Sequence, residues 1–155
     1  MTGAIPLQIF RIHLVLIALL GLLAVPASGA EELNLSLYEG KVVVVDFWAS
    51  WCVPCRRSFP WMNEMLRKYG DDGLVIVGIN VDADASEASQ FLAETPAEFR
   101  IIYDPEGELA RQYDVMAMPS SYLFDRSGRQ VARHLGFKVK QQDEYEALLV
   151  ETLNR

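Results

Sequence analysis

The run Lys41–Phe47 (KVVVVDF) is the feature that most constrains how this chain can fold. Its four successive valines leave no polar face, so a strand formed by them must be covered on both sides. A second apolar run, Leu74–Ile79 (LVIVGI), follows after a connection long enough for a right-handed βαβ crossover. Helices on both faces of a largely parallel sheet satisfy this requirement. The two runs therefore predict an α/β fold.

The rest of the pattern completes one domain around these strands. Between them, a helix is indicated by apolar residues at helical spacing, which we expect to form its buried face: Phe59, Met62, Leu66 and Tyr69. The turn at 125–128 predicts an antiparallel hairpin, so the sheet should be mixed. We expect helices at Ser86–Glu94 and Glu106–Tyr113, strands at Arg100–Tyr103, Ser121–Phe124 and Gln130–Leu135, and a closing helix carrying Tyr145, Leu148, Leu149 and Leu153.

The first 30 residues have the pattern of an export signal. Arg11 and His13 precede the apolar run Leu14–Val25, and small residues follow as far as Ala30. An uncleaved anchor is the alternative, but the run is shorter than the roughly 20 residues that span a bilayer. No cysteine follows it, which argues against a lipid anchor. We predict cleavage after Ala30 and a periplasmic domain at 31–155.

Charge and composition exclude some classes of partner. The chain has 14 Lys and Arg against 21 Asp and Glu, a net charge of −7, and loss of Arg11 with the signal makes it −8. An acidic domain of this kind is not expected to bind nucleic acid. No repeat or linker is visible, so we expect one domain. We expect no bound cofactor beyond a redox-active disulfide between Cys52 and Cys55, and we expect a monomer.

The two cysteines, Cys52 and Cys55, indicate redox chemistry. An exported protein meets an oxidising compartment, and a disulfide across so short a loop stabilises a fold little. The pair lies between a buried strand and a helix, so Cys52 should occupy a helix N-terminus, where a thiolate is stabilised. We expect Cys52 to be the nucleophile and Cys55, one turn later, to resolve its mixed disulfide. Pro54 is compatible with the first helical turn.

Metal binding is the alternative use of the pair. Two cysteines can form half of a zinc site, which usually needs four ligands. His134 is the one histidine after residue 30, so a Cys-Cys-His copper or zinc site stays open. We interpret His134 as an ordinary surface residue and expect no metal. Asp82 and Asp84 lack the rest of a calcium pattern, and we interpret them as solvated loop residues.

Asp46 is the most informative polar residue, because an acid inside VVVVDFW is desolvated unless something requires it there. Burial should raise its pKa. The alternative is a strand-end aspartate that caps nearby backbone groups.

The motif VDFWASWCVPC, followed by Pro60 and by Met118-Pro119, resembles the thioredoxin superfamily. The signal, the extra segment at 83–103 and YDVMAMPSSYLFDRSGR resemble its TlpA/ResA/CcmG-like branch, and the resemblance covers nearly all of 38–137. It implies a thioredoxin-like fold with Pro119 as the cis-proline beside the cysteines. It also implies that Met118 presents its backbone to substrate and that Asp46 exchanges a proton with Cys55.

The resemblance further implies a task and partners. The task is thiol-disulfide exchange with protein disulfide substrates, in the reductase direction, with a DsbD-like membrane electron donor. Trp51, Val53 and Pro54 should contact the substrate beside the sulfurs. The branch commonly carries a Glu where this chain has Ser58, a departure that weakens the inference of cytochrome c maturation.

Three rival functions share the fold. A disulfide oxidant would use the same cysteines in the opposite direction, and Val53-Pro54 does not settle the direction. A Sco-like copper-delivery protein spaces its cysteines one residue wider. A thiol peroxidase would carry a Thr where this chain has Ala49. The resemblance to TlpA-like proteins favours disulfide reduction as the expected activity.

Overall fold

The computed structural model describes residues 33–155, so the predicted signal at 1–30 lies outside the described residues. Five strands form one mixed sheet in the order β3-β2-β1-β4-β5. Its strands are β1 (Val42–Trp48), β2 (Leu74–Asn80), β3 (Arg100–Tyr103), β4 (Ser120–Phe124) and β5 (Gln130–Leu135). The helical elements are η1 (Leu35–Tyr38), α2 (Val53–Tyr69), α3 (Ala85–Glu94), α4 (Glu108–Gln112), η2 (Val139–Gln141) and α5 (Gln142–Leu153). Over 33–155, no helix combines the length and apolarity that a membrane span requires.

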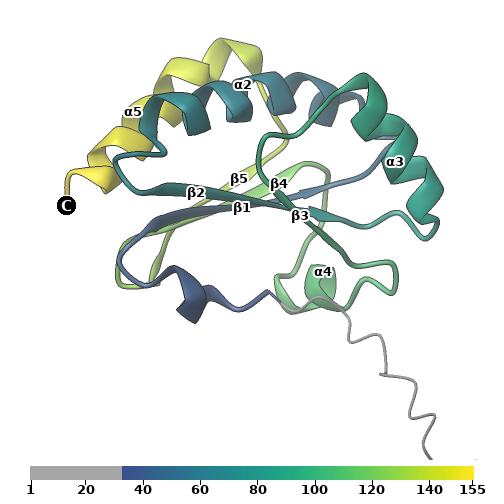
Figure 1. The fold of residues 1–155 in the computed structure, drawn as a ribbon, viewed down its shortest axis with the longest axis horizontal. Helices are drawn as coiled ribbons and strands as arrows, with labels where there is room; N and C mark the ends of the chain where they lie inside the picture. Colours follow the sequence, from purple (N-terminus) through teal and green to yellow (C-terminus); the bar gives the residue numbers. More distant parts are fainter. Residues whose placement is uncertain (1–32) are drawn as a thin grey trace, which may run out of the picture.

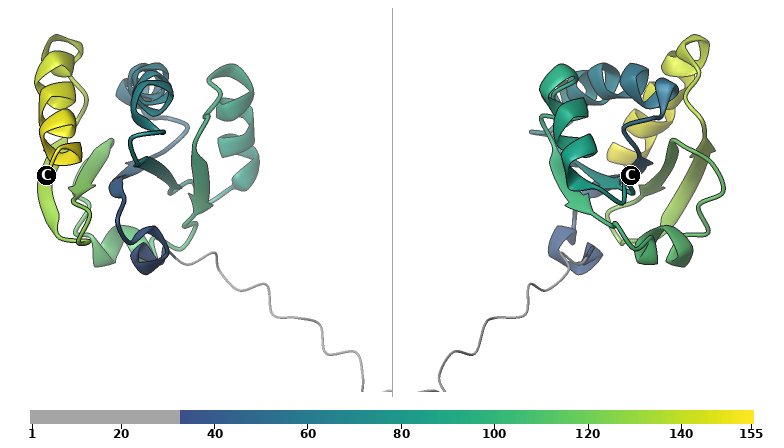
Figure 2. Two further views of the ribbon diagram at one scale, coloured as in Figure 1. Left: turned by 60° about the vertical axis from the view of Figure 1, so that its left-hand side comes forward. Right: turned by 90° about the vertical axis from the view of Figure 1, so that its right-hand side faces the viewer.

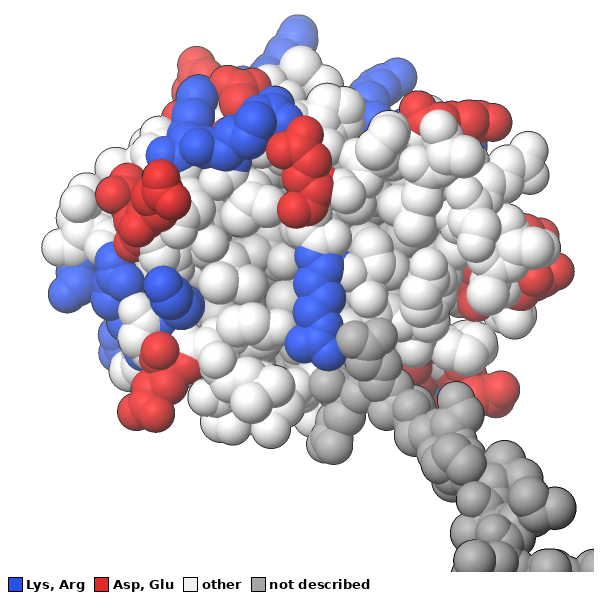
Figure 3. Space-filling view, viewed as in Figure 1, with Lys and Arg blue, Asp and Glu red and all other residues white. Residues whose placement is uncertain are grey.

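The helices cover the two faces of the sheet unequally. Figures 1 and 2 show α2 between α3 and α5 on one face, and the short elements α4 and η1 on the other. Each face has its own apolar core. Figure 3 shows basic and acidic side chains next to one another around the rim of the molecule in the view of Figure 1. The predicted α/β architecture with helices on both faces of a mixed sheet is confirmed.

Strand β1 is the centre of the sheet, as its valines predict. It pairs with β2 in parallel and with β4 in antiparallel orientation. Successive side chains of a strand point to opposite faces. Val42 and Trp48 accordingly pack beneath α2, whereas Val43 and Phe47 join the opposite core. Asp46, in step with Val42 and Trp48, therefore points toward α2.

Helix α2 follows the predicted spacing along its first half and departs from it later. Phe59 and Met62 are buried as expected, but Met65 takes the next buried position, and Leu66 and Tyr69 are partly exposed. Both side chains still pack against the core, so the prediction is confirmed only in part there. The Tyr69 hydroxyl donates a hydrogen bond to Glu146 of α5 at 2.6 Å, which holds its ring at the edge of the core.

The hairpin of β4 and β5 contains an irregularity in its pairing. Phe124 lies opposite Gln130, but the next pair is Leu123 with Ala132, so β5 contributes an extra residue. Beyond this bulge, Ser121 lies opposite His134. Ser121 is also the partner of Asp46 on β1.

Candidate active site

Several chain segments meet at one edge of the sheet. The parallel strands β1 and β2 end there, at Trp48 and Asn80. Strand β4 runs in the opposite direction and begins there, with Ser120 opposite Phe47. The segment before β4, Met118-Pro119, therefore lies beside the chain that leaves β1 toward the cysteines.

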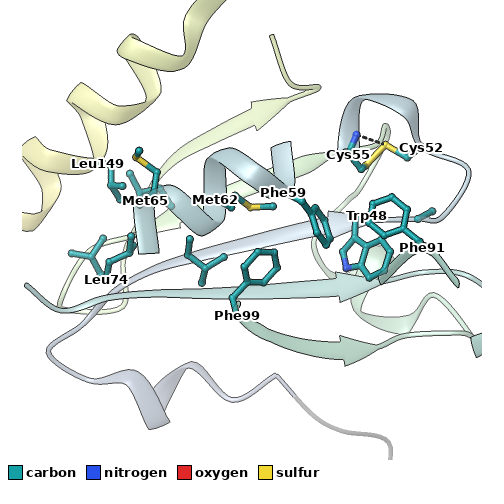
Figure 4. Packing of buried hydrophobic residues seen from close by; sticks show 14 of the residues in the cluster. Trp48, Cys52, Cys55, Phe59, Met62, Met65, Leu74, Phe91, Phe99 and Leu149 are labelled. Carbon is teal, nitrogen blue, oxygen red and sulfur yellow. Dashed lines mark hydrogen bonds between the residues drawn. A yellow bond between two sulfur atoms is a disulfide. The ribbon is translucent and has the colours of Figure 1, made fainter. Parts of the chain in front are cut away.

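Cys52 and Cys55 form a disulfide at the start of α2, and their Cα atoms are 5.3 Å apart. Cys52 is the N-cap of the helix, and its Sγ accepts a hydrogen bond from the Cys55 amide at 3.2 Å (Figure 4). Helix N-termini present unpaired N–H groups that stabilise a negative charge. The geometry therefore suits Cys52 for ionisation, and both sulfurs belong to buried residues.

Aromatic side chains pack in the same core cluster as the two cysteines. Trp48 is fully buried, with its ring centroid 5.0 Å from that of Phe59 and 4.7 Å from that of Phe91 (Figure 4). A Cβ at Gly78 would lie 3.1 Å from the Trp48 indole nitrogen and 2.9 Å from Ile101. A residue without a side chain at this position of β2 lets the indole ring approach the strand closely.

Asp82 anchors the loop that carries the cysteines, and its interpretation as a solvated residue was wrong. It is 4% exposed and accepts hydrogen bonds from the Ser50 amide at 2.8 Å and the Ser50 hydroxyl at 3.0 Å. The Asn80 side-chain amide donates a third bond at 2.7 Å. Asp84, by contrast, is exposed and caps α3. A buried carboxylate with three donors holds the chain two residues before Cys52 in place.

Apolar side chains next to the cysteines and near Met118 in the sequence are exposed to solvent. Trp51 is 67% exposed, Val53 61% and Met116 77%. Pro54 and Met118 are partly buried, and the Met118–Pro119 peptide bond is cis. Exposed apolar side chains around a reactive group can bind another polypeptide. Met116 was not singled out in the sequence, although its position two residues before Met118 was available as a signal.

Asp46 lies fully buried under α2, where Ser121 donates a hydrogen bond to its Oδ1. Its Oδ2 has no partner within the described part of the chain. Burial raises the pKa of Asp46 to about 7, and the Ser121 hydroxyl opposes part of this rise. Asp46 can therefore bind or release a proton near neutral pH. It does not cap backbone groups, which was the alternative interpretation.

A pocket between the sheet, α2 and α5 connects Asp46 to His134. Both residues line it together with Ser58 and Ser121. Ser58 is buried and donates a hydrogen bond to the Cys55 carbonyl at 3.1 Å, so the pocket begins one helical turn from the disulfide. His134 is half-buried, and burial lowers its pKa. Its interpretation as an ordinary surface residue was wrong.

The side chains in residues 33–155 form no group of three or more His, Cys, Asp or Glu that could hold a metal ion. His134, the histidine of the copper alternative, packs on Tyr145 of α5 with ring centroids 4.6 Å apart. The structure thus assigns His134 to the pocket of Asp46.

Comparison with known proteins identifies the family of this chain. Residues 21–149 match the Redoxin family. The chain belongs to this family. Thiol-disulfide oxidoreductase ResA of Bacillus thuringiensis subsp. konkukian is 31% identical over 116 residues, which are 74% of this chain and 67% of that protein.

Two solved structures extend the likeness. A Chlorobium tepidum protein described as thiol:disulfide interchange protein DsbE is 45% identical, with a TM-score of 0.76 over 78% of this chain and 86% of its own. The exposed lipoprotein thioredoxin Etrx1 of Streptococcus pneumoniae is 28% identical, with a TM-score of 0.66 over 76% of this chain and 89% of its own. This Redoxin-family protein is thus a thiol-disulfide oxidoreductase of the TlpA/ResA/CcmG-like branch of the thioredoxin superfamily.

Proposed function

We propose that this protein is an exported, periplasmic reductase of protein disulfides that receives its electrons from a DsbD-like membrane donor. The observation that carries the proposal is the Cys52–Cys55 disulfide at the N-terminus of α2, next to exposed apolar side chains. The predicted signal before Ala30 supports export. A periplasmic reductase needs electrons from across the membrane, and no nucleotide-binding motif is visible in the sequence.

The reaction begins with both cysteines reduced. The Cys52 thiolate attacks a substrate disulfide, one substrate sulfur leaves as a thiolate, and a mixed disulfide forms. Asp46 then takes the proton of the Cys55 thiol. The Cys55 thiolate attacks the Cys52 sulfur, the bond to substrate breaks, and the second substrate sulfur leaves as a thiolate. Water protonates the two substrate thiolates, and the enzyme keeps the disulfide seen in the structure.

The surroundings of the cysteines favour reduction over oxidation. A strong disulfide oxidant owes its potential to a stabilised reduced form, with a strongly stabilised thiolate. Here Val53 and Pro54 are uncharged, and the guanidinium of Arg56 is paired with Glu94 at 2.8 Å. Asp46, when ionised, adds a negative charge on the α2 side of the sheet, which disfavours a thiolate nearby. The helix N-terminus thus stabilises a Cys52 thiolate without a contribution from Val53 or Pro54.

The redox potential tests the direction. Equilibration with dithiothreitol or glutathione buffers should give a value nearer the roughly −270 mV of thioredoxin than the roughly −120 mV of DsbA. A potential at the oxidising end would instead favour the disulfide oxidant. A second experiment identifies the substrates in vivo. A Cys55→Ser variant cannot resolve its mixed disulfide, so it should retain substrate proteins on Cys52 for identification. Cys52→Ser is the matched control and should retain none.

A further inference from the structure

The strand register places three polar side chains in one row across the sheet. Asp46 on β1 lies opposite Ser121 on β4, and Ser121 lies opposite His134 on β5. Directly paired residues of antiparallel strands project from the same face. Neighbouring strands are about 4.8 Å apart, so His134 and Asp46 have Cα atoms roughly 10 Å apart, with Ser121 between them. All three line the pocket beneath α2 and α5.

The hydrogen bond from Ser121 decides which oxygen of Asp46 carries its proton. Because the Ser121 hydroxyl donates to Oδ1, that oxygen is occupied as an acceptor. The proton of the neutral carboxyl therefore resides on Oδ2, the oxygen without a partner in the described chain. A hydroxyl can also accept a hydrogen bond while it donates one, so Ser121 can take part in a longer chain of bonds.

The pocket that Asp46 and His134 line has room for water. The volume accessible to the centre of a water molecule is about 50 Å³, and a site of roughly 10–15 Å³ with polar partners can hold one. The hydroxyls of Ser58 and Ser121 and the His134 ring supply such partners, whereas Oδ2 of Asp46 is buried out of contact with water. The covering side chains, Trp61, Phe137 and Tyr145, are aromatic. Protons can therefore leave Asp46 through the polar row more readily than through this cover.

His134 is suited to pass a proton onward. Its ring is half-buried and held against Tyr145. Burial lowers its pKa, so at neutral pH the ring is uncharged and has one nitrogen that accepts a proton and one that can release it. The titratable groups that face it across the pocket are Asp46 of β1 and Tyr145 of α5, and α2 contributes Ser58, Trp61 and Met62 to the wall.

We propose that Asp46 exchanges its proton with solvent through His134, across the pocket that both residues line. This inference rests on the proposed role of Asp46 as the base for Cys55. In each turnover the proton of the Cys55 thiol moves to Asp46, then through the Ser121 hydroxyl and pocket water to one nitrogen of His134, while the other nitrogen releases a proton to solvent. His134 is a positioning residue in this scheme, because it acts through Asp46 and not on the sulfurs.

The test measures the decay of a mixed disulfide between Cys52 and glutathione by rapid quench, from pH 5.5 to 8.5. His134→Gln keeps a polar side chain that does not titrate. In this variant the rate at which Cys55 resolves the mixed disulfide should fall about 10-fold below pH 7, because Asp46 is protonated there and must release its proton before it can accept another. His134→Ala should show the same loss, and added imidazole should restore its rate. Imidazole should not rescue His134→Gln, which leaves no space for it.

Two further variants separate the possible causes. Tyr145→Phe keeps the ring that packs on His134 and should resolve at the wild-type rate. In an Asp46→Asn background, His134→Gln should have no additional effect, because the two residues act in series.

Each contrary result has a distinct meaning. Wild-type rates in both His134 variants, with slow resolution in Asp46→Asn, would overturn the relay and leave the role of Asp46 intact. An equal loss from His134→Gln with and without Asp46 would also overturn it, as a structural effect. An unchanged rate in Asp46→Asn would refute the proposed role of Asp46 itself.

Discussion

Replacing Asp46 by Asn should make the protein more stable, and by an amount that depends on pH. Asn has nearly the same shape, and its side-chain oxygen can still accept the Ser121 hydroxyl at the position of Oδ1. The amide group would replace Oδ2, which has no partner in residues 33–155. The substitution therefore removes the titration of a fully buried acid while it changes the packing little.

The magnitude follows from the pKa of Asp46, which burial raises from its ordinary value of 3.8 to about 7. Below about pH 4 the carboxyl is protonated in both the folded and the unfolded chain, so it makes no difference to stability. Between pH 4 and 7 the unfolded chain releases this proton and the folded chain keeps it, at about 1.4 kcal/mol per pH unit. By pH 8 the buried carboxyl therefore lowers the free energy of unfolding by about 4 kcal/mol.

Urea unfolding of the oxidised protein at pH 4 and pH 8 measures this effect. The free energy of unfolding of Asp46→Asn, minus that of the wild type, should rise by about 4 kcal/mol between the two pH values. Comparison of the two proteins at each pH cancels the titration of every other group. A difference that stays constant to within about 1 kcal/mol would show that Asp46 titrates normally, and the reasoning from its burial would fail.

The same variant should resolve mixed disulfides slowly. Loss of a general base slows proton transfer typically by about 10²- to 10⁴-fold, whereas attack by Cys52 should be unaffected. Rapid-quench measurement of the Cys52 mixed disulfide separates the two steps. If the resolution rate and its pH profile do not change, Asp46 is a structural residue.

Three other predictions concern the loop, the surface and the signal. Asp82→Ala should lower the free energy of unfolding by at least about 2 kcal/mol, because it leaves Ser50 and Asn80 donors without an acceptor; equal urea midpoints would contradict this. Trp51→Ala should change stability by less than about 0.5 kcal/mol, because the side chain is 67% exposed, yet slow reduction of protein disulfides more than that of glutathione disulfide. Mass spectrometry of periplasmic protein should show Glu31 as the first residue, and recovery of the whole chain in washed membranes would establish an anchor.

The sequence alone determined the features that depend on neighbouring residues. Four successive valines cannot form a one-sided strand, so β1 had to lie in the middle of a covered sheet. A cysteine pair placed between that strand and a helix had to lie at the helix N-terminus. The burial of Asp46 and its raised pKa followed from its apolar neighbours in the same way. The cis bond before Pro119 was available only through the resemblance to a family.

The role of Asp82 was decided by tertiary structure. In the sequence it is one of two acids in a short polar loop, and nothing nearby distinguishes it from Asp84. Because β1 and β2 are parallel, the chain leaving β2 meets the chain leaving β1 at the same edge of the sheet. Asp82 therefore reaches the amide and hydroxyl of Ser50, more than 30 residues away in the chain.

The row that joins Asp46 to His134 depends on a single extra residue in β5. With Phe124 opposite Gln130, an unbroken antiparallel register would place Arg133 opposite Ser121 and turn His134 to the other face. The bulge at Leu123 and Phe124 shifts the pairing by one residue and brings His134 over the pocket. A strand's side chains alternate faces with every residue, so its local sequence cannot determine which ones face the core until the sheet has set the register.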